Sequence, residues 1–224
     1  MLMCEFVDDS LSAFKFNDLV ACGVDSLVEW ADYRPFAARP FGNHPIWAGY
    51  DPQDSVDGDN AALVIAAPPS APGGVFRLLE RHQLRGMDFE QQAEFIRAVL
   101  AKYHCTYLGI DATGIGSAVY QLCCKWMPTA TKIEYSVEVK ATMVMKAQNL
   151  FSRRRVCFDA SWSDLVGSYL AIKKALTASG RSITFKAGRG SETRHADLAW
   201  ACMHIFLNEP LDGKPKPVGS MEII

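Results

Sequence analysis

The sequence predicts an α/β domain in which helices flank a mixed β-sheet, and three observations carry this prediction. Residues 45–84 read as three strands joined by short polar links, which is typical of an antiparallel meander. Residues 88–158 then alternate helices with strands, which is typical of parallel crossover units. Two of the strands also end in an aspartate, and ligands collect at the carboxyl ends of strands in open α/β sheets.

The composition of the chain limits the class of protein to which it can belong. The chain has 224 residues, enough for one large domain, and 49% hydrophobic and 21% charged residues are usual for a soluble globular protein. The formal net charge is −2, so no global basic character indicates nucleic-acid binding. A site for a polyanion would therefore have to be a local patch.

Cysteine usage and hydropathy indicate the compartment. The seven cysteines are an odd number and none lies in a CxxC pair with zinc-site spacing, which argues against a disulfide framework or a structural zinc site. No apolar run approaches the roughly 20 residues that span a bilayer, and no signal-peptide pattern is present. We expect a soluble intracellular protein with reduced thiols.

The first and last stretches differ from the regular middle of the chain. Residues 1–42 contain one predicted short helix, Phe16–Trp30, and are interpreted as a surface arm or as the trailing end of another domain. The regular domain is expected to run from residue 43 to 209. Residues 210–224 are polar and rich in proline, so a flexible tail is predicted.

The meander is predicted to begin with the apolar strand Ile46–Tyr50. Ala61–Ala67 is an apolar run of strand length, and Val75–Leu84 is the third strand. Asp88 is expected to cap the helix that follows, with Gln91 as its capping-box partner.

Apolar residues recur at helical spacing, or fill short runs, through the rest of the chain. Glycines and prolines separate these segments. The pattern predicts strands at Tyr107–Asp111, Ile133–Val137, Val156–Phe158 and Ser182–Lys186, and helices at Gly116–Trp126, Ala141–Ser152, from Ser161 or Ser163 to near Gly180, and from about Thr193 to Asn208.

Three aspartates stand out by their context. Asp51 follows the first strand, Asp111 ends a later strand, and Asp197 lies early in the apolar final helix. A carboxylate beside a buried helix is costly unless it is paired or binds metal, and three converging carboxylates would repel one another. Divalent cations remove that penalty, and two ions about 3.5–4 Å apart can clamp a phosphodiester. We therefore predict that the three acids are catalytic and bind metal.

Each of these residues also has an ordinary interpretation. Asp51 could begin a turn, Asp111 could cap a helix, and Asp197 could be an acid in the first turn of a helix. Asp59 could be an auxiliary metal ligand or part of a solvated acidic loop. His195 could contact phosphate or lie on the surface.

Positive charges in the second half of the chain could form a groove that follows a nucleic-acid backbone. A solvated charged face is the alternative, and no aromatic-interleaved pattern for reading bases is present. The predicted DNA-binding residues are Lys140, Lys146, Arg153, Arg154, Arg155, Arg189, Arg194 and His195.

Three stretches of the chain resemble one known family. They are Trp47–Asp51 with the later Gly58-Asp59, Gly109–Gly116, and Arg194–Ala201. Together they resemble the C-terminal nuclease domain of the large terminase subunit of tailed bacteriophages. The lead-in stretches Cys4–Asp9 and Arg34–Gly42 also resemble the segment that joins motor to nuclease in the subfamily of temperate enterobacterial phages. The resemblance extends over about residues 2–208. The element order is also that of the ribonuclease H fold, although several other folds share it.

The resemblance implies an RNase H-like fold and endonucleolytic cutting of concatemeric viral DNA in the bacterial host cytoplasm. It implies metal binding by Asp51, Asp111 and Asp197, with Asp59 less secure, and a cofactor of Mg²⁺ or Mn²⁺, as two ions. The implied partners are double-stranded DNA, the small terminase subunit, the portal or procapsid, and an N-terminal ATPase domain, without a membrane. The pattern G-x-x-x-x-G-K-[ST] is absent from the sequence, so we expect the chain to be a fragment without motor activity.

Other functions fit the same pattern. Asp51 and the Asp-Ala-Thr-Gly turn at residues 111–114 are similar to the phosphate loops of actin-like ATPases and sugar kinases, which would make the chain a fragment of a nucleotide-binding enzyme. A nuclease-like scaffold that only docks DNA or a portal is a second alternative. Transposases and Holliday-junction resolvases share the metal chemistry.

Overall fold

The computed structural model describes residues 12–52, 60–176, 183–187 and 196–209. Within them a seven-stranded sheet has the order β1-β7-β4-β3-β2-β5-β6, and β8 and β9 form a separate hairpin. The strands are β1 (Gly23–Val24), β2 (Pro45–Asp51), β3 (Ala61–Ala67), β4 (Phe76–Leu84), β5 (His104–Asp111), β6 (Thr131–Ile133), β7 (Val156–Asp159), β8 (Ile172–Leu176) and β9 (Ile183–Ala187). The helices are α1 (Phe16–Val20), α2 (Ser26–Glu29), α3 (Phe89–Leu100), α4 (Gly116–Cys124), α5 (Val137–Ser152), α6 (Ser163–Leu170) and α7 (Asp197–Leu207).

The sheet is mixed, as the sequence predicted. Strands β2, β3 and β4 form the antiparallel meander. Strand β5 pairs in parallel with β2, and β6 pairs in parallel with β5 after the α4 crossover. Strand β7 is parallel to both β4 and β1. The predicted α/β class with a mixed sheet is therefore confirmed.

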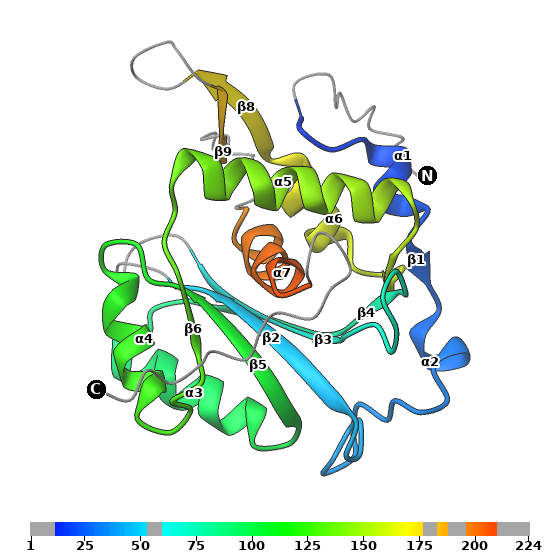
Figure 1. Ribbon diagram of the computed structural model, residues 1–224. Coiled ribbons are helices and arrows are strands. Elements are labelled where there is room, and N and C mark those ends of the chain that lie inside the picture. Colours follow the sequence, from blue (N-terminus) through cyan, green and yellow to red (C-terminus); the bar gives the residue numbers. More distant parts are fainter. Residues whose placement is uncertain (1–11, 53–59, 177–182, 188–195, 210–224) are drawn as a thin grey trace.

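Helices cover both faces of the sheet (Figure 1). One hydrophobic core lies on the side of α5, α6 and α7, and the other lies on the side of α3 and α4. The capping box predicted for α3 is present, because Asp88 accepts from the backbone N–H of Gln91 while the Gln91 side chain accepts from that of Asp88. No helix in the described part of the chain is both long enough and apolar enough to cross a membrane.

Strand β2 is the one on which α7 lies most closely. Ile46, Ala48 and Tyr50 alternate into the core beneath α3 and α4, so Gly49 faces the α7 side. A Cβ atom at Gly49 would lie 2.0 Å from the carbonyl oxygen of Ala201 in α7. Glycine is therefore what allows the two backbones to approach, and Asp51, two residues further on, shares the face that α7 covers.

Two element predictions in the second half of the chain were wrong. The helix expected to reach Gly180 ends at Leu170, and the residues after it form β8. Burial alternates along β8 with a period of two, and its pairing with β9 replaces helical hydrogen bonds. The strand expected at 133–137 ends at Ile133, because Ser136 caps α5 through the backbone N–H of Val139.

Residues 12–42 do not form the single helix expected at 16–30. They form α1, β1 and α2, and β1 adds an edge strand to the sheet beside β7. Phe14 and Leu19 are buried in the core beneath α5, and Trp30 and Tyr33 are buried in the core beneath α3. This segment therefore contributes to both sides of the sheet, and a domain boundary at residue 42 stays a prediction.

Candidate metal centre

Two of the predicted acids lie at the ends of neighbouring strands. Strands β2 and β5 are parallel, and the last pair in their register is Tyr50 with Ile110. The next residue in each strand is an aspartate, Asp51 in β2 and Asp111 in β5. Parallel pairing thus delivers both carboxylates to the same edge of the sheet.

The third acid, Asp197, comes to this edge on a helix. It is the first residue of α7, and its neighbours Ala196 and Leu198 are each 1% exposed. The helix is held against β2 through Gly49. The first turn of a helix suits an acidic side chain, because the free backbone N–H groups there carry partial positive charge.

The other two acids influence the pKa of Asp51. It is raised well above its usual value, first by burial and then by the negative charges of Asp197 and Asp111. The nearby Tyr135 hydroxyl, 3.4 Å from Oδ1 of Asp51, and the positive charge of Lys140 act in the opposite direction. The three acids predicted from the sequence therefore share one electrostatic environment.

The turn after β5 fixes Asp111. Its Oδ1 accepts hydrogen bonds from the backbone N–H of Thr113 at 2.8 Å and from the Thr113 hydroxyl at 2.6 Å. Burial raises the pKa of Asp111, and the Thr113 bonds and the charge of Lys140 oppose the rise. Gly114 has a φ of +59° and Gly116 opens α4, where a Cβ would lie 2.3 Å from the Asp111 carbonyl oxygen. Glycines therefore let the chain turn tightly behind the carboxylate.

Two polar residues at the site were missed in the sequence. The Tyr135 hydroxyl lies 3.4 Å from Oδ1 of Asp51 and 2.7 Å from Nε2 of the buried His204. Burial raises the pKa of Tyr135 most, and the charges of Asp51, Asp111 and Asp197 raise it further. His204 lies seven residues after Asp197, and this spacing, which returns to the same helix face, is the signal that could have found it. Tyr135 belongs to a predicted strand and carried no signal.

Lys140 is the predicted DNA-binding residue that the structure brings to the acids. Its Nζ lies 4.7 Å from the centre of the Tyr135 ring and 5.3 Å from that of Trp200. Burial lowers its pKa, while the negative charges of Asp111 and Asp51 oppose the change. The Lys140 ammonium thus lies near two aromatic rings and close to the carboxylates of Asp51 and Asp111.

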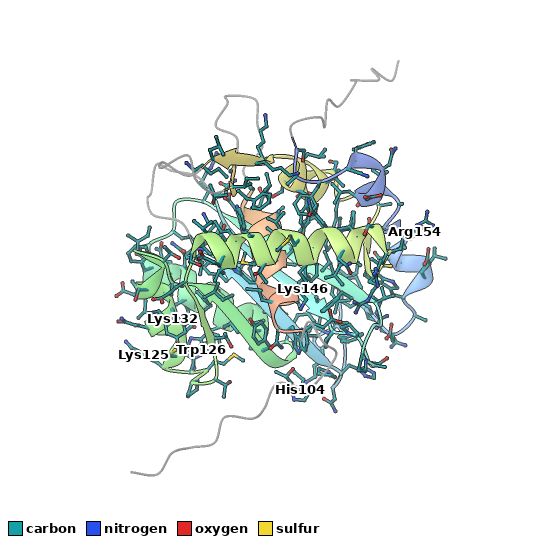
Figure 2. All side chains as sticks on the ribbon, turned by 45° about the horizontal axis from the view of Figure 1, so that its top comes forward. His104, Lys125, Trp126, Lys132, Lys146 and Arg154 are labelled. Atoms are coloured by element: carbon teal, nitrogen blue, oxygen red, sulfur yellow. The ribbon has the colours of Figure 1, made fainter. Side chains whose placement is uncertain are left out.

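The other described basic candidates lie toward the far end of α5. Lys140 and Arg153 are thirteen residues apart, about 20 Å along the helix. Figure 2 shows Lys146 midway along α5 and Arg154 at its C-terminal end. The Lys146 ammonium donates to the backbone carbonyl of Glu209, and Arg155 forms an ion pair with the Glu209 carboxylate.

Lys146 is only 8% exposed and Arg155 is partly buried, whereas Arg153 and Arg154 are exposed. The described candidates therefore do not form one continuous groove beside the acids, and their contact with DNA stays a prediction. Asp59, Arg189, Arg194 and His195 lie outside the described residues.

The chemistry of the donors fits a hard divalent cation. All three acids offer carboxylate oxygens, which Mg²⁺ prefers, and the mutual repulsion that raises the pKa of Asp51 is what a cation would relieve. Among the residues that the structure describes, no three His, Cys, Asp or Glu side chains are already arranged as a metal cage. Burial raises the pKa of Cys105 and of Cys202 to about 12, so these thiols stay protonated and are not candidate ligands.

A mixed sheet in this order, with helices on both faces, places the protein in the RNase H-like class. The chain belongs to the family described as the terminase RNaseH-like domain, whose sequence pattern matches residues 48–209. It is 53% identical over 211 residues to the terminase ATPase subunit of Escherichia phage P2, and 42% identical over 217 residues to the probable terminase ATPase subunit of Haemophilus phage HP1. These matches cover 94% and 96% of the chain but 35% of each relative, so the chain spans about a third of their length.

Solved structures support the fold assignment. The large terminase nuclease of the thermophilic phage G20c, in its magnesium-bound crystal structure, superposes with a TM-score of 0.65. The match covers 88% of this chain and 97% of that one, with 17% sequence identity. The same nuclease has also been crystallised with bound cobalt. At this identity the likeness shows a shared RNase H-like fold.

Proposed function

We propose that this chain is the nuclease part of a large terminase subunit, a metal-dependent endodeoxyribonuclease that cuts concatemeric viral DNA during genome packaging. The observation that carries the proposal is that Asp51 and Asp111 end neighbouring parallel strands, while Asp197 begins the helix that packs against β2. Membership of the terminase family and the magnesium-bound G20c nuclease support it.

In this proposal Asp51, Asp111 and Asp197 hold Mg²⁺ or Mn²⁺, as two ions, and Asp59 is an auxiliary ligand. Bound divalent cations supply an activated water and neutralise the charge that develops on the oxygens of a phosphodiester. The protein contributes the rigid placement of the ligands, for which the two Thr113 hydrogen bonds to Asp111 are the best example.

Lys140 has a separate role in the proposal. Its ammonium group is held by the rings of Tyr135 and Trp200 at the acidic edge, where it can attract a phosphate group without replacing a ligand. Without bound cations, its charge partly offsets that of Asp51 and Asp111. Lys140 therefore stabilises the acidic site when no cation is bound, and it also favours the binding of DNA.

The proposed partners follow from the family. They are double-stranded DNA, the small terminase subunit, the portal or procapsid, and an ATPase domain of the same subunit, in the host cytoplasm. The phage P2 relative is named an ATPase subunit and is about three times as long as the region matched here. Motor activity is accordingly assigned to the part of such subunits outside this chain.

A plasmid-cleavage assay tests the proposal. Purified chain is expected to nick or linearise supercoiled plasmid in Mn²⁺ or Mg²⁺ and to be inactive in EDTA. Asp111→Asn is expected to reduce cleavage to background while keeping the far-UV circular dichroism of the wild type. Glu94→Gln, an exposed change on α3, is the matched control and should cut normally.

Several outcomes would contradict the proposal. Cleavage that persists in EDTA, or in Asp111→Asn, would show that metal binding by the acids is not required for cleavage. DNA binding without any cleavage by the wild type would favour a docking module.

A further inference from the structure

His204 is a buried histidine behind the acidic edge, and its two ring nitrogens have different partners. It is 0% exposed. Its Nδ1 lies 3.0 Å from the backbone carbonyl oxygen of Tyr50, and its Nε2 lies 2.7 Å from the Tyr135 hydroxyl. Both partners belong to residues that border Asp51, in sequence for Tyr50 and in space for Tyr135.

The Tyr50 carbonyl determines which nitrogen carries the proton. A carbonyl oxygen only accepts hydrogen bonds, so Nδ1 of His204 must be the N–H donor. Burial in this apolar position lowers the pKa of His204 to about 3, so the ring is neutral and Nε2 has no proton. Nε2 is therefore an acceptor.

The Tyr135 hydroxyl then has two possible acceptors for its one proton. Nε2 of His204 is at 2.7 Å, whereas Oδ1 of Asp51 is at 3.4 Å. The shorter contact is at the usual distance for a strong hydrogen bond and the longer one is near the limit. The proton therefore lies toward His204, and the lone pairs of the phenol oxygen remain on the side of Asp51.

We propose that His204 is a positioning residue that holds the Tyr135 proton away from Asp51, so that Asp51 stays available to a divalent cation and the phenol oxygen is an acceptor for a water at the site. The inference builds on the proposed function, in which Asp51 is a metal ligand. Tyr135 acts on the site, and His204 acts through Tyr135.

The proposal has a consequence that a merely structural histidine would not have. If His204 is replaced by a residue without an acceptor, the Tyr135 hydroxyl turns to Asp51, and its hydrogen bond competes with the cation. Removing the hydroxyl as well abolishes the competition. The second substitution is therefore expected to repair the first.

Calorimetric titration with Mn²⁺ and no DNA measures this directly. His204→Phe is expected to bind Mn²⁺ about tenfold more weakly than the wild type, the effect of one hydrogen bond. Tyr135→Phe is expected to bind at least as well as the wild type. The double variant is expected to bind like Tyr135→Phe, and a double variant as weak as His204→Phe would overturn the proposal.

A second measurement does not depend on a substitution that could unfold the protein. Long-range ¹H–¹⁵N NMR spectra of the wild type are expected to show His204 as the neutral tautomer protonated on Nδ1, with Nε2 accepting. A proton on Nε2 would overturn the proposal. His204→Gln retains a side-chain carbonyl as acceptor and is expected to bind Mn²⁺ close to the wild-type affinity if it folds.

The two proposals fail in different ways. If the wild type binds no Mn²⁺, the proposed function fails, and the NMR tautomer still upholds or overturns the position of the Tyr135 proton. If Mn²⁺ binds to the wild type and not to Asp111→Asn, but His204→Phe has no effect, the proposed function stands and the role of His204 is wrong.

Discussion

Strands β2 and β5 carry the same pattern side by side. Each has an aromatic residue, then a glycine, then an aspartate at alternate positions, as Trp47, Gly49 and Asp51 in β2 and Tyr107, Gly109 and Asp111 in β5. The register pairs the two aromatic residues with each other and the two glycines with each other. The two aromatic rings are 5.8 Å apart between centroids. In sequence and in register, the two strands are near copies.

Their surroundings differ. Asp51 has one long contact, with Tyr135, and its pKa is raised by burial and by two neighbouring acids. Asp111 accepts two short hydrogen bonds from Thr113, which oppose the rise in its pKa. A strand pattern can place a carboxylate at the edge of a sheet, but the following turn and the helix packed above it determine how costly the charge is.

The two glycines give the largest predicted difference. A Cβ at Gly49 would meet the backbone oxygen of Ala201 at 2.0 Å, whereas one at Gly109 would meet the ends of the Tyr107 and Ile133 side chains at 2.6 and 3.0 Å. Gly49→Ala is therefore expected to lower the free energy of unfolding by about 3 kcal/mol or more, and Gly109→Ala by about 1 kcal/mol. Urea denaturation checks this, and equal losses would contradict the close approach of α7 to β2.

The two acids give the next difference. In EDTA, Asp51→Asn is expected to raise the melting temperature, because it removes a charge that burial and two acids disfavour. Asp111→Asn should raise it less or lower it, because it weakens hydrogen bonds that Thr113 donates to an ionised oxygen. Each kcal/mol corresponds to roughly 2–4 °C for a chain of this size. With saturating Mn²⁺ the wild type should instead have the higher melting temperature of the two, since it gains stability from the bound ion and Asp51→Asn does not.

The pH dependence of the Asp51 effect has a definite sign. Because the folded-state pKa of Asp51 lies above the unfolded-state value, the folded wild type holds this proton more tightly. Its contribution to stability is present below the unfolded-state pKa and is lost as pH rises through the folded-state pKa. In EDTA the advantage of Asp51→Asn over the wild type should therefore grow from pH 4 upward and then level off. An advantage that shrinks with pH would show that Asp51 is not crowded by the other acids.

Thr113→Val gives the smallest predicted effect. Valine keeps the shape of the side chain but removes the hydroxyl, which donates to Asp111 and accepts from the backbone N–H of Tyr135. The expected loss is about 1 kcal/mol in the free energy of unfolding, together with weaker Mn²⁺ binding. Thr129→Val, at an exposed position, is the matched control and should leave both unchanged. Unchanged Mn²⁺ binding in Thr113→Val would show that Asp111 does not need this support.

Local patterns were enough for much of the fold. The bounds of β3, the capping box of α3, and the positions of Asp51 and Asp111 at strand ends follow from short-range periodicity and turn chemistry. The sequence pattern predicts a helix in the segment that includes β8, because a short mixed apolar run fits both the helical and the strand periodicity, and only pairing with β9 decides between them.

The site was predicted less completely, because its supporting residues meet only in three dimensions. Tyr135 lies in a connection between β6 and α5, and its role depends on His204 in a helix 69 residues later. The sequence shows Lys140 and Lys146 as similar charges on one helix, but packing directs Lys140 to the acids and Lys146 to the backbone of Glu209. No local pattern records where a long side chain ends.

The parallel pairing of β1 with β7 has a practical consequence for trimming this protein. A truncated protein that starts at β2 would lack the edge strand β1 and the buried rings of Phe14 and Trp30. Strand β7 would then become an exposed edge strand with unpaired backbone groups. Such a truncated protein should be prone to aggregate during expression. Truncated versions of this protein should therefore keep the sequence from residue 12 onward, although the sequence of residues 12–42 lacks a regular secondary-structure pattern.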